Sequence, residues 1–184
     1  MSMGGGARVI YDMVPGPERS GRPFDGPDGS TLVWREAVAW YFGATRSGRR
    51  SGRWVWVDAS EAVVKVQHFD GGLLNGVEAT WFCPFRSGIP APDVYDRGNI
   101  ASLGVFVDGM RDGEWTEWHK NGKPSMRRNY NLDLEDGLSE SWHPNGQLKE
   151  KGAYKEGEKD GVWIHQDEEG NVTRTETWAR GRKL

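Results

Sequence analysis

Apolar and polar positions between Gly113 and Tyr130 follow the pattern of a single β-hairpin. An aromatic-bearing run, Trp115–Trp118, leads into Asn121-Gly122, and a second run, Met126–Tyr130, follows. Asn-Gly supplies the two positive-φ residues of a type I′ turn, so the pattern predicts a two-residue loop. Counting outward from that loop gives the facing pairs Lys120/Lys123, Trp118/Ser125, Trp115/Arg128 and Tyr130/Gly113. In the last pair, we expect the ring to cover bare glycine backbone.

The same pattern recurs with a spacing of 24 residues, lengthened once. The copies begin at Gly52, Gly76, Gly113, Gly137 and Gly161. An aromatic residue follows four of these glycines by 17 residues (Phe69, Tyr130, Tyr154, Trp178), and Phe106 takes this place, 13 residues later, in the second copy. Tryptophans stand two residues after the glycine (Trp54, Trp115, Trp163) or five after it (Trp81, Trp118, Trp142). Since strand side chains alternate, the two tryptophan sets belong to opposite faces.

A fixed repeat of this length predicts a repeat architecture. We expect an all-β fold, an elongated single-layer antiparallel meander of about five 24-residue hairpin repeats over residues 52–184. An insertion interrupts the second repeat at about 83–102. Residues 30–51 are expected to form a degenerate capping repeat of one or two strands, with a short helix over Arg35–Tyr41 as the alternative. Residues 1–29 are read as a Gly/Pro-rich arm.

Composition narrows the function classes. The net charge of −3 comes from 24 basic and 27 acidic residues that are intermixed, which disfavours a nucleic-acid binder. The single cysteine, Cys83, excludes an internal disulfide and suits a reducing compartment. The sequence has no apolar run of about 18 residues and no signal-peptide pattern at its start. A cytoplasmic location is therefore the expectation, without an integral membrane segment.

The sequence offers no catalytic arrangement. It lacks GxSxG, P-loop, HExxH and CxxC motifs, so we expect no enzymatic activity. His119 and His143 occupy the same repeat position without a cysteine pair or carboxylate to complete a zinc site, so we expect neither metal nor cofactor. The dense basic cluster Arg46–Arg53 reads as a solvated loop, and anion binding is the alternative.

Two features suggest a surface that binds a partner. Both faces of a single-layer sheet cannot be fully buried, so the Trp81, Trp118 and Trp142 set should be partly exposed, as binding hot spots are. The insertion carries Phe85, Arg86, Ile89 and Tyr95. These residues either fold back over Trp81 or form a recognition loop. The predicted partner-binding residues are these seven.

The segment Trp142–Trp163, WHPNGQLKEKGAYKEGEKDGVW, resembles the MORN-repeat variant of the bacterial YwqK-like antitoxin family. The resemblance covers residues 52–184, and 29–51 in degenerate form. It implies a protein–protein interaction module of antitoxin or immunity type that neutralises a toxin or effector encoded nearby. The alternatives are a peripheral lipid-associated scaffold and a glycan-binding repeat protein. Monomer and edge-paired dimer both stay open.

Overall fold

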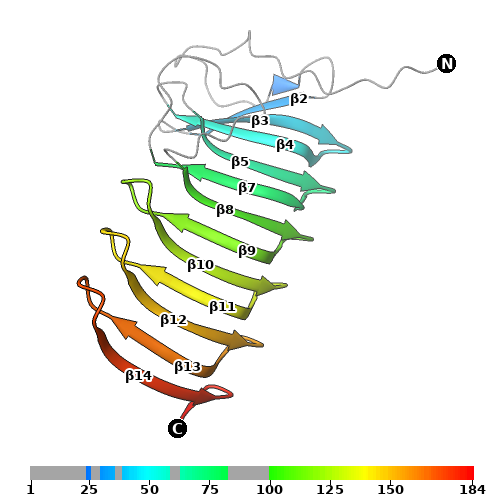
Figure 1. Cartoon of the computed structure of the whole chain (residues 1–184). Coiled ribbons are helices and arrows are strands. Elements are labelled where there is room, and N and C mark those ends of the chain that lie inside the picture. Colours follow the sequence, from blue (N-terminus) through cyan, green and yellow to red (C-terminus); the bar gives the residue numbers. More distant parts are fainter. Residues whose placement is uncertain (1–23, 26–29, 36–38, 59–62, 83–99) are drawn as a thin grey trace, which may run out of the picture.

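The computed structural model describes residues 24–25, 30–35, 39–58, 63–82 and 100–184, and the side chains of 43–56, 63–82 and 100–184. These residues form one antiparallel sheet of fifteen strands (Figure 1). Consecutive strands are neighbours in the order β1-β2-β3-β4-β5-β7 to β15, and the short β6 pairs with β5. The all-β meander predicted from the repeat pattern is confirmed.

The strands of the first half are β1 (Phe24–Asp25), β2 (Ser30–Arg35), β3 (Ala39–Arg46), β4 (Arg49–Asp58), β5 (Val63–Asp70), β6 (Leu73–Leu74) and β7 (Gly76–Trp81). Those of the second half are β8 (Ile100–Val107), β9 (Met110–Trp118), β10 (Pro124–Asn131), β11 (Leu134–Trp142), β12 (Leu148–Lys155), β13 (Glu158–Gln166), β14 (Val172–Ala179) and β15 (Arg182–Lys183). The alternative helix over Arg35–Tyr41 is wrong for its described residues, because they lie in β2 and β3.

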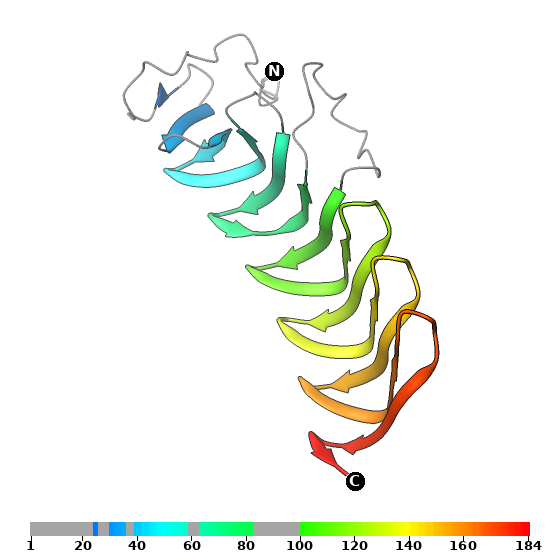
Figure 2. The same ribbon diagram turned by 90° about the vertical axis from the view of Figure 1, so that its left-hand side faces the viewer.

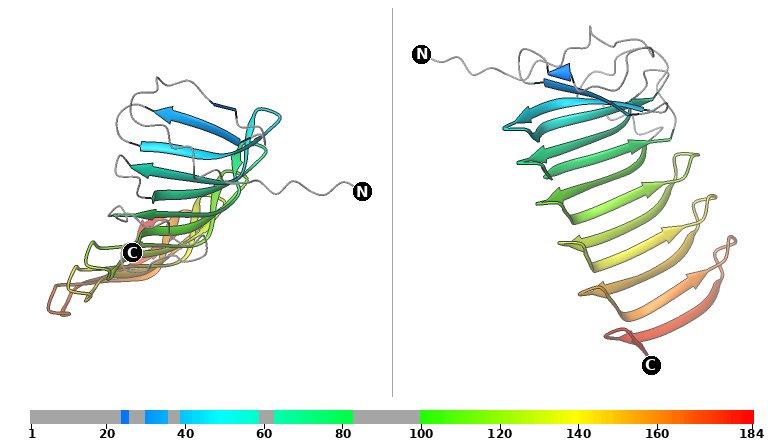
Figure 3. Two further views of the ribbon diagram at one scale, coloured as in Figure 1. Left: turned by 90° about the horizontal axis from the view of Figure 1, so that it is seen from above. Right: turned by 180° about the vertical axis from the view of Figure 1, so that it is seen from behind.

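The sheet is elongated and strongly curved. The strands stack one after another from β2 to β15, and each hairpin is bent in cross-section (Figure 2). Both views of Figure 3 show the stack turning gradually along its length. No second layer of described residues covers either face, so burial has to come from side chains on the sheet itself.

The loop at Asn121-Gly122 is not a two-residue type I′ turn, and that prediction is wrong. The Gly122 N–H donates to the His119 carbonyl at 2.9 Å, and the His119 N–H donates to the Lys123 carbonyl at 2.8 Å. Lys120–Gly122 therefore form a three-residue loop, in which Gly122 alone has positive φ (81°). This is the type I turn followed by a left-handed glycine, the next commonest hairpin loop. The Asn121 side chain favours it by accepting the Lys123 N–H at 3.1 Å.

A bulge corrects the register after this loop. Trp118 pairs with Pro124, not with the predicted Ser125, and Lys123 faces His119, not Lys120. The register then shifts by one residue between Pro124 and Met126. The predicted pairs Trp115/Arg128 and Tyr130/Gly113 are consequently confirmed. Bulges at the same place follow the pairs Trp142/Leu148 and Gln166/Val172.

The type I′ turns lie at the opposite edge of the sheet. Among the residues that the structure describes, six pairs have positive φ at both positions: Ser47-Gly48, Gly71-Gly72, Asp108-Gly109, Leu132-Asp133, Glu156-Gly157 and Arg180-Gly181. We call these the tight turns. They form one row along the right-hand edge of Figure 1, and the longer hairpin loops form a row on the left. The sheet thus has a tight-turn edge and a loop edge.

Tryptophan rings make the core by covering glycines in the preceding strand. A Cβ added to Gly104 would lie 2.1 Å from Trp115 Cδ2, and one added to Gly152 would lie 2.2 Å from Trp163 Cδ2. Trp54 covers Gly43 in the same way. In each case the indole N–H donates to the carbonyl of the residue after the glycine, at 3.0–3.2 Å.

The predicted covering of Gly113 by Tyr130 is therefore wrong, although their register is right. A Cβ on Gly113 would meet nothing within 4 Å, and the glycine has a φ of 75°. Tyr130 packs edge-to-face against Trp115 instead, with ring centroids 6.5 Å apart. Similar contacts join Phe106 to Trp115 and Tyr154 to Trp163. Trp54 and Trp163 are only 1% exposed, because neighbouring rings and backbone enclose them. We call this side of the sheet the aromatic face.

Candidate functional site

The second tryptophan row (Trp81, Trp118 and Trp142) lies on the opposite side, which we call the second face. Trp81 packs against the buried pair Val55 and Val66. Val55 follows Trp54 directly in β4 and pairs with Val66 of β5, so both valine side chains lie on the face opposite the Trp54 ring. Trp118 and Trp142 end strands β9 and β11 beside the loop edge. All three are partly buried, in contrast to Trp54 and Trp163. The second row is therefore the more accessible of the two tryptophan rows, as the sequence indicated.

Arg127 adds a cation to the second row. Its guanidinium carbon lies 5.6 Å from the Trp142 ring centroid, and its Nε is buried without a hydrogen-bond partner. The guanidinium lies within cation–π distance of the indole, and both side chains are only partly buried. Tryptophan and arginine are the side chains that most often dominate binding energy at interfaces.

The seven predicted partner-binding residues divide into two groups. Trp81, Trp118 and Trp142 are placed as described, and Trp81 serves partly as core. Phe85, Arg86, Ile89 and Tyr95 lie outside the described residues. At the end of the expected insertion, Ile100–Ser102 belong to strand β8, where Ile100 pairs with Trp81. Phe82, which the sequence reading did not single out, is 39% exposed directly after Trp81.

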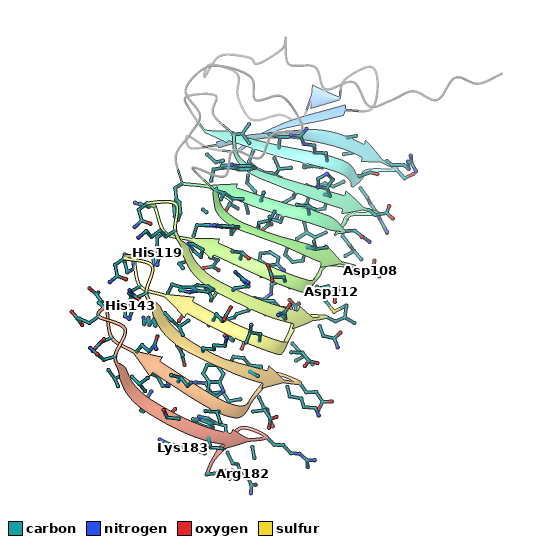
Figure 4. All side chains as sticks on the ribbon, in the orientation of Figure 1. Asp108, Asp112, His119, His143, Arg182 and Lys183 are labelled. Atoms are coloured by element: carbon teal, nitrogen blue, oxygen red, sulfur yellow. The ribbon has the colours of Figure 1, made fainter. Side chains whose placement is uncertain are left out.

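The histidines and asparagines of the loop edge connect neighbouring loops. His119 Nε2 lies 2.9 Å from the Trp142 carbonyl oxygen, and Asn121 Nδ2 donates to the Pro144 carbonyl at 2.7 Å. One repeat later, His143 and Asn145 make the same bonds to the carbonyls of Gln166 and Glu168. Figure 4 shows both histidines on this edge. These side chains hold the platform beneath the second row, a role visible in sequence only as their repetition every 24 residues.

The basic cluster at Arg46–Arg53 does not act as one group. Arg50 stacks over three rings of the aromatic face, with its guanidinium carbon 4.7, 5.9 and 5.3 Å from the centroids of Trp54, Trp56 and Phe69. Arg46 and Arg49 are exposed at the first tight turn. The cluster is thus divided between the aromatic face and the tight-turn edge.

The last repeat closes with a charged network around Glu176. Lys183 Nζ lies 2.7 Å from Glu176 Oε1, Arg174 Nε lies 3.4 Å away, and His165 Nε2 is 3.5 Å from Oε2. The hydrogen bond from Lys183 is the main cause that lowers the pKa of Glu176 to about 2, with Arg174 and the Trp178 indole adding to it. A carboxylate held ionised by cations is suited to structure rather than to proton transfer.

Within the described residues, no group of three or more His, Cys, Asp or Glu side chains could hold a metal ion. In that same part of the chain, no helix is long and apolar enough to cross a membrane.

The fold and the second row define the protein as a β-hairpin repeat platform with an accessible tryptophan–arginine surface. Residues 111–132 and 135–156 match the family model of the MORN repeat variant. The two matches are adjacent copies, each holding one hairpin, β9–β10 and β11–β12. MORN repeats generally mediate interactions with proteins or membrane lipids and are not typically enzymes. No curated protein matches the chain.

Proposed function

We propose that this chain is a non-enzymatic cytoplasmic module that binds another protein through its second tryptophan row. The observation that carries the proposal is the different burial of the two rows. Trp54 and Trp163 are 1% exposed and cover glycines, so they serve the fold. Trp118 and Trp142 are more exposed and cover no glycine of the described residues.

The chemistry of the row favours a protein partner. On binding, partly exposed indoles beside a guanidinium can bury a large apolar area and also form directional polar contacts, the composition typical of interface hot spots. The loop-to-loop hydrogen bonds of His119 and Asn121 hold the row rigid, which lowers the entropy lost on binding.

The finer proposal is that the partner is a toxin or effector encoded nearby, which this protein neutralises. It rests on the resemblance of Trp142–Trp163 to the YwqK-like antitoxins together with the binding surface described above. A neutralising protein needs only to cover its partner, and a rigid platform without catalytic groups is sufficient for that.

The test uses the full chain and the double variant Trp118→Ala/Trp142→Ala as baits in lysate of the source organism. Partners are quantified by mass spectrometry, and the enriched protein is then titrated in purified form. Leu184→Ala, which removes an apolar side chain that is 79% exposed elsewhere, is the control. We expect the double variant to weaken binding by at least tenfold, the effect of losing one strong hot spot, while the control binds normally.

Equal binding by the double variant and the wild type would remove the second row as the site. For the finer proposal, the purified partner is co-expressed with either protein and growth is measured. Partner expression that is harmless in both strains would contradict neutralisation without affecting the binding proposal.

A further inference from the structure

Arg127 of β10 is a partly buried arginine that lacks a carboxylate partner in its own chain. From β9 to β14, the other partly buried arginines, Arg111 and Arg128, form ion pairs with Asp133 and Glu135. None of the ion pairs of this described range involves Arg127, and its Nε has no hydrogen-bond partner. Holding a guanidinium partly out of water without an anion costs free energy. The charge of Arg127 is therefore available to a bound group.

The register places Arg127 between two tryptophans of the second row. Arg127 pairs with Thr116 of β9 on one side and with Glu140 of β11 on the other. Trp118 and Trp142 come two residues after these partners, so both indoles lie on the same face as Arg127, one step nearer the loop edge. A group that binds to Arg127 is therefore close to an indole on each neighbouring strand.

Glu140 faces Arg127 across the strands but forms its ion pair elsewhere. Its Oε1 lies 3.0 Å from the Lys151 Nζ of β12, and the Glu140 side chain is 12% exposed. The charges of Arg127, Glu140 and Lys151 therefore sum to +1 (two cations and one anion). One carboxylate would balance this charge. A phosphate group carries about −1.5 to −2 charges, which exceeds it.

The charge of the hairpin loops changes along the loop edge, where His119 and His143 mark the first two loops in Figure 4. The loop 119–123 carries Lys120 and Lys123 and no acidic residue, a formal charge of +2 with the histidine neutral. The loop 143–147 has no formal charge, and the loop 167–171, with one Asp and two Glu, has −3. The loop next to Trp118 thus attracts an anionic segment, and the loop after β13 repels it.

We propose that the second row binds an acidic peptide segment of a protein partner, an inference that rests on the proposed function and names the chemistry of that partner. One Asp or Glu carboxylate of the segment binds the two Nη nitrogens of Arg127, since the Nε is buried. An apolar side chain next to this carboxylate packs on Trp118 or Trp142, as an anchor does at an interface. The loop charges place the segment over β9–β11 rather than over β13–β14.

The probe is a phage-displayed library of random dodecapeptides, selected on the immobilised full chain and on its variants. The wild type should enrich peptides in which Asp or Glu lies next to an aromatic or large aliphatic residue. Arg127→Glu should instead enrich peptides with Lys or Arg in that place, because the charge of the site is reversed. Lys155→Glu makes the same change of charge at an exposed position on the tight-turn edge and should select the wild-type set.

Dissociation constants then test the contact itself. One selected peptide is synthesised together with a second version that carries the corresponding amide in place of the carboxylate. Arg127→Gln should bind the acidic peptide about tenfold more weakly than the wild type does, the effect of losing a hydrogen bond between charged groups. The wild type should lose a similar factor with the amide peptide, and Arg127→Gln should bind both peptides alike. Circular dichroism confirms that each variant is folded.

Enrichment of uncharged or basic peptides by the wild type overturns this inference, and so does the enrichment of no peptide. Equal affinity of Arg127→Gln and the wild type for the acidic peptide also overturns it. If Trp118→Ala/Trp142→Ala no longer binds that peptide, the tryptophans remain the site and only the carboxylate contact is wrong. Enrichment of the same peptides by the double tryptophan variant removes the second row itself, and the proposed function with it. Wild-type binding to phosphatidylserine vesicles but not to acidic peptides assigns the row to a lipid surface and overturns the acidic segment.

Discussion

The substitution Gly152→Ala tests whether tryptophan rings on glycine hold this single-layer sheet together. The new Cβ would lie 2.2 Å from Trp163 Cδ2 and 2.3 Å from Cε2, atoms in the interior of the indole rather than at a flexible end. The ring would have to leave its site, where it is 1% exposed and donates to the Ala153 carbonyl. Losing a buried tryptophan costs about 3–5 kcal/mol, so we expect a loss of about 3 kcal/mol or more.

If the Trp163 ring causes the loss of stability in Gly152→Ala, a double-mutant cycle will show the dependence directly. In a Trp163→Ala background, Gly152→Ala meets open space. Alanine is favoured over glycine in a strand interior by about 0.5–1 kcal/mol, so the same change becomes neutral or stabilising there. The expected coupling between the two substitutions is about 3–4 kcal/mol.

The assay is urea denaturation followed by far-ultraviolet circular dichroism, with the m-value compared between variants because repeat arrays can unfold in segments. Gly161→Ala is the matched control. It has a φ of 76° and no atom within 4 Å of the added Cβ, so backbone strain alone should cost about 1–2 kcal/mol. If Gly152→Ala costs no more than Gly161→Ala, or costs as much without Trp163, the ring does not depend on that glycine.

Three further predictions concern the remaining repeat features. Because Lys183 lowers the pKa of Glu176 to about 2, the ionised Glu176 carboxylate stabilises the fold at pH values above its ordinary pKa near 4.5, and this stabilisation is lost as the pH falls toward 2. Glu176→Gln should make the melting temperature depend less on pH over that window. A pH dependence equal to that of the wild type would contradict this. Asn121→Ala should cost about 0.5–1.5 kcal/mol in urea by removing a loop-to-loop hydrogen bond. Asp133 has a φ of 70° and accepts from Arg111 Nε at 2.9 Å, so Asp133→Ala should destabilise more than Asp133→Gly, which relieves the strain.

The sequence determined the architecture because its signals are local and repeated. The 24-residue spacing, the alternation of tryptophans and the glycines at both turn positions specify antiparallel hairpins without knowledge of distant contacts. The register was predictable for the same reason. The loop at Asn121-Gly122 is one residue longer than expected, and the bulge before Met126 removes that extra residue, so Tyr130 still faces Gly113.

Which glycine lies beneath which ring was decided only by the tertiary structure. The copy glycines, such as Gly113, stand out in sequence because every copy has one, yet they serve the bend of the strand. The covered glycines, Gly104 and Gly152, belong to alternate copies. Where the glycine is absent, the facing positions are polar, as in the pair Gln67 and Glu78, which are hydrogen-bonded. Both kinds of contact, the ring on a glycine and the polar pair, join neighbouring strands that belong to different copies, so no single repeat contains either of them.

Part of the candidate binding surface was likewise predictable from the sequence. Alternation along β9 was enough to place Trp118 on the face opposite Trp115, and sequence spacing was enough to group it with Trp142. The row of tight turns was not foreseen, because its members are far apart in the sequence and each belongs to an ordinary turn. Stacking the repeats brings every tight turn to one edge. A pattern spread over several copies thereby becomes one row of tight turns, which no single repeat contains.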